Sequence, residues 1–234
     1  MIQFRALKAM ALALTAAALM AGPAAADSVT YNLDQDACTG GCGVSMSLSG
    51  GTVTLNEVSP YQVDIIVTLA QGVKFVNTGA GDSLAFNMTP GANIQLGAPA
   101  NVFQYSSDGS DWSNNDKFVA AGSPKGFQNG GYGYGVDYTD GNGASKAIGG
   151  GLKVSVISQT AISIANFVAN GIGMLFSVDV IGTTGKTGNI GAKTTSVINN
   201  GGGGGGTAVP EPMSMLLLGP AAFGLAALRR RRRV

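Results

Sequence analysis

Two cysteines near the start of the chain carry its clearest chemical signal. Cys38 and Cys42 lie in the segment CTGGC, where Gly40 and Gly41 permit a tight backbone turn. In an oxidising compartment this spacing closes a small disulfide loop, and in a reducing compartment it leaves two free thiols. A metal site would need two further ligands, and the chain has no histidine and no other cysteine. We expect a Cys38–Cys42 disulfide, with free thiols and a metal site as the alternatives.

Two loops rich in aspartate, asparagine and serine offer the oxygen ligands that calcium prefers. The first holds Asp108, Asp111 and Asp116, and the second spans residues 137–142. Neither has the EF-hand spacing, and the same residue types are common in ordinary turns. We therefore expect solvated turns and no cofactor, and a weak calcium site at Asp108, Asp111 and Asp116 is the alternative.

The missing histidine also limits catalysis. Histidine is the most frequent general base, so Ser-His-Asp and Cys-His mechanisms are excluded. A glycosidase needs two carboxyl groups, and Glu57 is the only glutamate in the body of the chain. We expect no enzymatic activity, and a secreted hydrolase is the weakest of the alternatives.

Aromatic residues gather between Trp112 and Tyr138. Tyr132 and Tyr134 are separated by glycine, and Phe127 lies nearby. Such rings could stack on the sugar rings of an exopolysaccharide, or they could pack against a sheet as ordinary apolar groups. We expect these rings to pack against a sheet.

The elements that would position these residues are strands. Apolar and polar residues alternate over 62–69, 152–156 and 176–180, as expected for strands with one face in a core. Shorter candidate strands span 44–48, 52–55, 73–76, 83–88, 102–105 and 195–198. Only 161–169 could form a helical turn or two. Glycine-rich turns separate these strands, so we expect residues 27–200 to form one all-β domain, a β-sandwich or jelly roll.

The charge of this body differs from that of the whole chain. The chain has a net charge of +1, but all its arginines lie in the two terminal segments. Residues 27–206 contain seven lysines and twelve acidic residues, which gives −5. Such a body cannot attract phosphates, so nucleic-acid binding is excluded.

The N-terminal segment has the organisation of a secretory signal peptide. Arg5 and Lys8 precede the apolar stretch 9–21, and Ala24-Ala25-Ala26 provides a cleavage site with small residues. We expect residues 1–26 to be removed by signal peptidase. An uncleaved N-terminal anchor is the alternative.

The C-terminal segment combines three parts that no globular core requires. A glycine-rich linker, 201–208, precedes Pro210, Glu211 and Pro212. The uncharged apolar residues 213–228 follow, and the cluster Arg229, Arg230, Arg231, Arg232 and Arg233 comes next. A helix of sixteen residues would cover roughly 24 Å, which is short for a bilayer core of about 30 Å. Such a helix would be a weak transmembrane anchor with its basic end in the cytoplasm. A buried C-terminal helix is the alternative.

Residues 209–234 resemble the PEP-CTERM sorting signal of exported Gram-negative bacterial proteins, which is also catalogued as an ice-binding-protein C-terminal motif. The resemblance implies that exosortase, an integral-membrane enzyme, recognises Pro210-Glu211-Pro212 and removes the tail. The stretch Phe167–Gly188 is loosely similar to the late body of many such proteins, where a strand precedes a Thr-Gly-rich hairpin. A regular threonine array for ice binding is not found at Thr183, Thr184 and Thr187.

The resemblance implies an inner-membrane-anchored precursor whose product reaches the periplasm, outer surface or extracellular matrix. We expect a structural protein associated with exopolysaccharide or biofilm. The alternative is a carbohydrate- or calcium-binding matrix module carried by loops 108–116 and 127–142.

Overall fold

A computed structural model describes residues 27–45, 47–78, 82–96, 103–114, 117–121, 127, 129–140 and 143–198. The described residues belong to one compact unit that ends at Ile198. The expected signal peptide, glycine-rich linker and sorting signal lie outside them. Within the described residues, no helix is long and apolar enough to cross a membrane.

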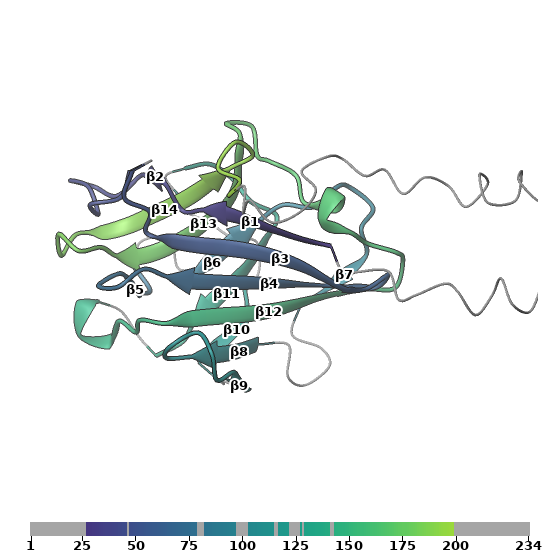
Figure 1. Ribbon diagram of the computed structural model, residues 1–234, viewed down its shortest axis with the longest axis horizontal. Helices are drawn as coiled ribbons and strands as arrows, with labels where there is room; N and C mark the ends of the chain where they lie inside the picture. The colour runs from purple at the N-terminus through teal and green to yellow at the C-terminus, as the bar shows by residue number, and fades with distance from the viewer. Residues whose placement is uncertain are drawn as a thin grey trace, which may run out of the picture. The chain divides into compact units, whose positions relative to one another are not determined.

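The chain forms two antiparallel sheets (Figure 1). Sheet A has the strand order β1-β3-β4-β12-β8-β9, with β7 also paired to β12. Its strands are β1 (Ser28–Asn32), β3 (Gly51–Ser59), β4 (Gln62–Leu69), β7 (Ile94–Gln95), β8 (Phe103–Ser106), β9 (Ser113–Asn114) and β12 (Gly151–Ser158).

Sheet B has the strand order β10-β11-β6-β13-β14-β2, with β5 also paired to β13. Its strands are β2 (Gln35–Asp36), β5 (Lys74–Phe75), β6 (Leu84–Phe86), β10 (Phe118–Ala120), β11 (Tyr134–Tyr138), β13 (Met174–Ile181) and β14 (Thr187–Lys193). Two short 3₁₀ turns, η1 (Ala144–Lys146) and η2 (Ile164–Asn166), complete the described elements.

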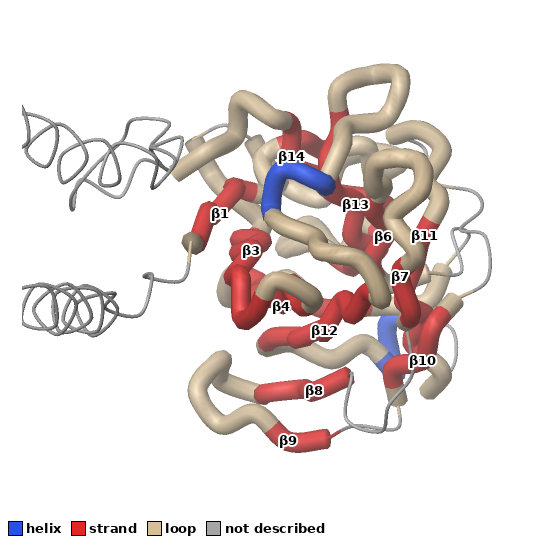
Figure 2. The backbone as a smooth tube through the Cα atoms, turned by 90° about the vertical axis from the view of Figure 1, so that its right-hand side faces the viewer, coloured by secondary structure: helices blue, strands red, loops and turns tan. Residues whose placement is uncertain are grey.

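The two sheets share one hydrophobic core, and Figure 2 shows them as two layers. Alternate residues of β3, β4 and β12 meet those of β6 and β13 in a single cluster of buried side chains. Aromatic rings join the layers directly. The ring centroids of Tyr31 in β1 and Phe176 in β13 are 5.9 Å apart, and those of Tyr105 in β8 and Phe118 in β10 are 6.3 Å apart. This arrangement confirms the predicted all-β class and is consistent with a β-sandwich.

Most predicted strands are present, with corrections at the shorter ones. The long strands predicted at 62–69, 152–156 and 176–180 are β4, β12 and β13. The segments 44–48 and 195–198 were expected to be strands, but each makes only an isolated bridge, Ser45 to Leu48 and Val197 to Tyr31. The possible helix at 161–169 is limited to η2.

The hairpin expected after residue 180 is formed by β13 and β14. Its turn is closed by the Gly182 amide, which donates a hydrogen bond to the Lys186 carbonyl at 2.9 Å. The strand β14 was not predicted, because its sequence TGNIGAK has few of the β-branched residues that mark strands.

The outer faces of the sheets differ. Along β12, exposure alternates from residue to residue, as a strand with one solvated face requires. Along β13, the residues from Met174 to Val180 are all buried. The alternation in this segment predicts solvent contact for Ser177 and Asp179, and that prediction is wrong, because further chain segments cover this face of sheet B.

Candidate functional site

The predicted disulfide is present. Cys38 and Cys42 are bonded, with their Cα atoms 5.5 Å apart, and no described cysteine is free. Gly40 and Gly41 have φ angles of +83° and +78°, which residues with a Cβ atom rarely adopt. The two glycines therefore let the chain turn sharply enough to bring the sulfur atoms together.

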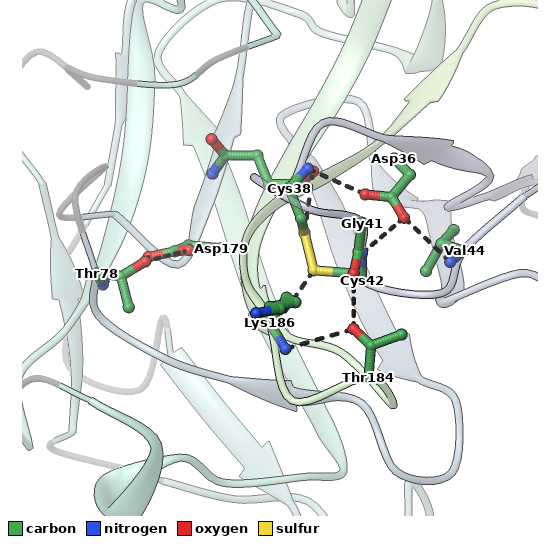
Figure 3. Close-up of a disulfide and its surroundings, with 10 residues drawn as sticks. Asp36, Cys38, Gly41, Cys42, Val44, Thr78, Asp179, Thr184 and Lys186 are labelled. Atoms are coloured by element: carbon green, nitrogen blue, oxygen red, sulfur yellow. Dashed lines mark hydrogen bonds between the residues drawn. A yellow bond between two sulfur atoms is a disulfide. The ribbon is translucent and has the colours of Figure 1, made fainter.

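A single carboxylate organises the backbone of this loop (Figure 3). Asp36 accepts hydrogen bonds from the backbone amides of Cys38 at 3.0 Å, Cys42 at 2.8 Å and Val44 at 3.2 Å. Backbone amides that converge on one anion fix the loop without help from a bound ion. Sequence reasoning missed Asp36, although its position two residues before Cys38 is typical of an aspartate that accepts from nearby amides.

The disulfide loop packs against the β13–β14 hairpin. Thr184 Oγ1 donates a hydrogen bond to the Gly41 carbonyl at 2.6 Å. A Cβ added at Gly182 would lie 2.1 Å from the Cys42 carbonyl oxygen, and one at Gly188 would lie 2.7 Å from Cys38 Cα. Both hairpin glycines are therefore needed for this close approach, and the loop fastens the end of sheet B.

This loop also contains the only group of three potential metal ligands that the described residues bring together. One ligand atom each of Asp36, Cys38 and Cys42 lie within 4.8 Å of one another. Thiolates bind metals, but these two sulfur atoms are already joined to each other. The geometry supports a structural role for the three residues.

The first acidic loop is organised around Asp108. Its Oδ1 atom accepts hydrogen bonds from Ser106 Oγ at 2.9 Å and from the Ser110 amide at 2.9 Å. The backbone hydrogen bond from Ser110 is the main cause that holds the pKa of Asp108 well below its usual range. Asp108 thus fixes the turn that precedes Trp112. Asp111 is exposed, and Asp116 lies outside the described residues.

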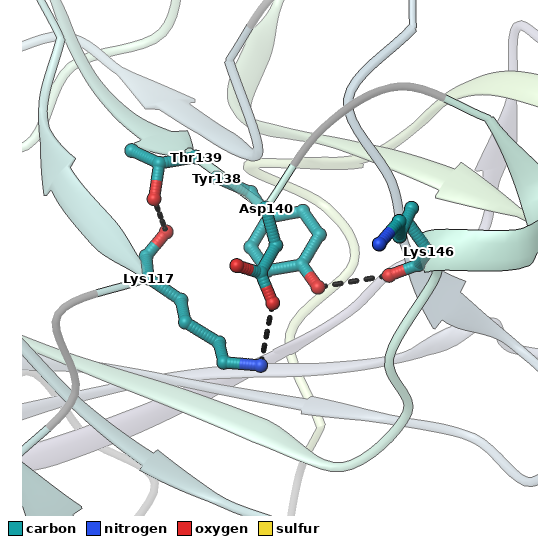
Figure 4. A network of polar contacts seen from close by, with 5 residues as sticks. All are labelled: Lys117, Tyr138, Thr139, Asp140 and Lys146. Carbon is teal, nitrogen blue, oxygen red and sulfur yellow. Dashed lines mark hydrogen bonds and ion pairs between the residues drawn. The ribbon is translucent and has the colours of Figure 1, made fainter.

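The carboxylates of the second acidic loop also have partners within the protein. Asp140 forms an ion pair with Lys117, and the Tyr138 hydroxyl donates to the Lys146 carbonyl at 2.8 Å (Figure 4). Asp137 accepts a hydrogen bond from Asn77 at 3.1 Å, and burial raises its pKa. These contacts join β10, β11 and η1, so they stabilise the edge of sheet B.

The glycine-spaced tyrosines pack against other aromatic rings of the protein. Tyr132 and Phe127 are buried, with ring centroids 5.4 Å apart, and Tyr138 is buried against Phe118. The half-buried Tyr134 stacks on Phe86 at 5.6 Å. The expectation that these rings pack against the sheet is confirmed.

The covered outer face of sheet B contains a buried carboxylate. Asp179 has no exposed surface, and it accepts hydrogen bonds from the Thr78 amide at 2.7 Å and the Thr78 hydroxyl at 2.8 Å. Burial raises the pKa of Asp179 to about 6, although the hydrogen bonds from Thr78 oppose the shift. The neighbouring negative charge of Asp82 adds to the increase. Asp179 thereby fastens the segment after β5 to the middle of sheet B.

Next to Asp179, the segment that contains Asn129 covers the same face of sheet B. Ser177 Oγ donates to Asn129 Oδ1 at 2.7 Å in a buried hydrogen bond. Asn129 precedes β11 and lies over Gly191, where an added Cβ would be 2.7 Å from Asn129 Nδ2. Ala85, Phe127, Tyr132 and Met174 form a small second apolar cluster here. This part of the outer face of sheet B is therefore buried, and the described residues leave no open surface over Ser177.

The outer face of sheet A has the opposite character. One row of paired residues crosses all six strands of the main path, from β1 to β9: Thr30, Thr54, Ile66, Lys153, Gln104 and Asn114. All six are at least partly exposed. Trp112 lies over the neighbouring row, where a Cβ added at Gly151 would be 2.8 Å from Cη2 of the indole ring. Trp112 is partly exposed, so part of its side chain is available for contact on this polar face.

The residues predicted to direct sorting lie outside the described residues. They are Pro210, Glu211 and Pro212, together with Arg229 to Arg233. No family model matches the chain, and comparison with curated proteins and with solved structures finds no similar protein.

Proposed function

We propose that the chain is an exported protein of a Gram-negative cell envelope, delivered by its C-terminal sorting signal. It acts as a structural, non-enzymatic component of the extracellular matrix and associates with exopolysaccharide or biofilm. The observation that carries the proposal is the order of parts at the C-terminus. A Pro-Glu-Pro motif, an apolar segment at 213–228 and five arginines follow one another directly. Apolar residues enter the bilayer, and the arginines hold the end of the segment on the cytoplasmic side.

The Cys38–Cys42 disulfide supports export. Disulfides persist in oxidising compartments such as the periplasm and the cell exterior, and they are rare in the bacterial cytosol. The expected signal-peptidase site, made of the small residues Ala24-Ala25-Ala26, also supports export. Signal peptidase and exosortase are the partners during processing, and the inner membrane holds the precursor.

For the fold we propose a β-sandwich of the jelly-roll type. The chain crosses repeatedly between the two sheets, since β6 lies in sheet B, β8 in sheet A, β11 in sheet B, β12 in sheet A and β13 in sheet B. Such crossings between two antiparallel sheets are typical of Greek-key and jelly-roll domains.

Among the alternatives, carbohydrate binding has a specific observation in its favour, because Trp112 is partly exposed on the open face of sheet A. Calcium binding by Asp108, Asp111 and Asp116 has less support. One oxygen of Asp108 is already occupied by hydrogen-bond donors from the protein, and donors of this kind repel a cation.

Mass spectrometry of the protein released by producing cells tests the proposal. The expected chain begins near Asp27 and ends between Pro210 and Pro212, and Glu211→Ala leaves the precursor in the inner membrane. Glu57→Ala is the matched control, because it removes a glutamate outside the motif. Release of a protein that still carries Arg229 to Arg233 would rule out sorting.

A further inference from the structure

The outer face of sheet A presents regularly spaced polar groups. Strands in a sheet lie about 4.8 Å apart, so the paired residues of one row repeat at that distance across the face. Thr30, Thr54 and Thr52 contribute hydroxyl groups, and Gln104 and Asn114 contribute amides. The charged groups Asp64 and Lys153 have opposite signs, so this part of the face carries little net charge.

Several of these side chains are held in place before any ligand arrives. The hydroxyls of Thr30 and Thr54 lie 2.9 Å apart and share a hydrogen bond. Asp64 accepts hydrogen bonds from Gln62 Nε2 at 2.9 Å and from Ser155 Oγ at 2.8 Å. Polar groups that are already fixed lose little conformational entropy when a ligand binds, so they favour binding.

Trp112 places an aromatic ring on this polar face. The turn that carries it folds back over β4, since a Cβ added at Gly109 would lie 3.7 Å from Thr68 Cγ2. The ring edge rests on Gly151, and Lys153 Nζ lies 6.0 Å from the ring centroid. Asp108 holds the turn through its hydrogen bonds and so acts as a positioning residue for the ring.

From this combination we infer that the outer face of sheet A, around Trp112, binds an uncharged polysaccharide. The apolar C–H face of a sugar ring stacks on an aromatic ring, and its hydroxyls exchange hydrogen bonds with threonine and amide side chains. An apolar peptide or a lipid would leave these polar groups unpaired, at a cost in binding free energy. A nucleic acid would meet a body of net charge −5.

The inference rests on the proposed association with exopolysaccharide and identifies the surface responsible. The strand arrangement also sets the size of the ligand. The row from Thr30 to Asn114 crosses six strands, which corresponds to roughly 24 Å at about 4.8 Å per strand. That length accommodates several sugar units, so a polysaccharide is expected to bind better than a monosaccharide.

The chain provides its own reporter, because Trp112 is its only tryptophan. The protein isolated from producing cells is titrated with a soluble neutral galactomannan, a soluble β-glucan and the anionic polysaccharide alginate. We expect at least one neutral polymer to change the tryptophan emission and to retard the protein in native gels. Alginate is expected to do neither.

Variants locate the site. The Trp112 variants lack the tryptophan reporter, so their binding is measured by retardation in native gels. There Trp112→Ala is expected to weaken binding about tenfold or more, as loss of a ring-stacking contact requires. Trp112→Tyr, which keeps an aromatic ring, is expected to retain most of the binding. Tyr61→Ala is the matched control, because Tyr61 is 54% exposed but lies at the β3–β4 turn. Urea unfolding of each variant checks that the domain is folded.

The possible outcomes distinguish a wrong binding site from a wrong association with polysaccharide. If the unmodified chain binds a neutral polymer and folded Trp112→Ala binds equally well, the site is wrong and the association stands. If the unmodified chain binds none of the three polymers, both the site and the association with polysaccharide are wrong. Binding of alginate in preference to the neutral polymers also contradicts the inference. Export is judged independently, by the masses of the released chain.

Discussion

On β12 of sheet A, Lys153 and Ser155 remain partly exposed, whereas Ser177 and Asp179 at the equivalent alternate positions of β13 in sheet B are fully buried. Both strands alternate apolar and polar residues, so both have one face in the shared core. The faces differ because segments around Thr78 and Asn129 pack onto sheet B from outside. A polar outer face thus serves as an open surface in one sheet and as a second interior in the other.

The largest expected effect compares two serines. Ser177→Val removes the hydrogen bond to Asn129 and adds volume where no space is left, so we expect a loss of about 2–5 kcal/mol in the free energy of unfolding. Ser155→Val, the matched change on sheet A, loses the hydrogen bond to Asp64 and a longer one from Gln62 Nε2 at 3.4 Å. Its side chain is partly exposed, so the change is expected to cost about 1 kcal/mol. Urea unfolding measures both. Equal losses would show that the two outer faces are equally exposed.

The second effect is a pH dependence that originates from Asp179. Burial raises the pKa of Asp179 from its ordinary 3.8 to about 6 in the folded protein, so between these values the folded state binds more protons. The stabilising contribution of Asp179 is therefore complete below about pH 4, and it falls by roughly 3 kcal/mol as the pH rises through 6. Asp137, whose pKa is also raised, acts in the same direction.

Asp179→Asn isolates this contribution. The variant cannot titrate at this position, so its stability is expected to change much less between pH 4 and 7, as measured by urea unfolding at each pH. Asp108 has a lowered pKa, so its stabilising effect is lost only at pH values below the window of Asp179. A variant with the same pH profile as the unmodified protein would mean that Asp179 is in contact with water.

A third, smaller effect concerns the loop at the end of sheet B. Replacing Cys38 and Cys42 by serine opens a loop of five residues, which the chain-entropy model values at about 2 kcal/mol. Thermal unfolding is expected to shift by about 4–8 °C for a domain of this size. Thiol labelling of the unreduced protein should detect no free cysteine. Full labelling of both cysteines without reductant would contradict the bond.

The smallest effect is expected on the open face. Thr54→Val keeps the branched side chain on β3 and removes a partly exposed hydrogen bond to Thr30, so it is expected to cost about 0.5–1 kcal/mol in the free energy of unfolding. Leu55→Ala, at the next residue, removes a fully buried side chain and is expected to cost about 2–5 kcal/mol. If Thr54→Val were as damaging as Leu55→Ala, sheet A would be covered on both faces.

The sequence allowed prediction of the all-β class, the long strands and the disulfide, because these depend on local alternation and spacing. It did not reveal that Ser177 and Asp179 are buried, since the residues that contact them, Asn129 and Thr78, lie about 50 and 100 positions away in the chain. The strand β14 was missed because its two glycines weaken the strand pattern, although Gly188 permits the approach of Cys38 and Gly191 that of Asn129. The sequence grouped Trp112 with Tyr132 and Tyr138, and only the fold shows that Trp112 is partly exposed on sheet A while the two tyrosines are buried.

Hydrogen–deuterium exchange with and without a neutral polysaccharide that binds tests the central comparison most directly. We predict slower exchange in β4, β8, β12 and the turn that carries Trp112, with no change in β6, β11 and β13. Among the described residues, Ser177 and Asp179 have no exposed surface, so exchange around them should depend only on the stability of the domain. Protection confined to β6, β11 and β13 would contradict the account, because it would place the binding surface on sheet B.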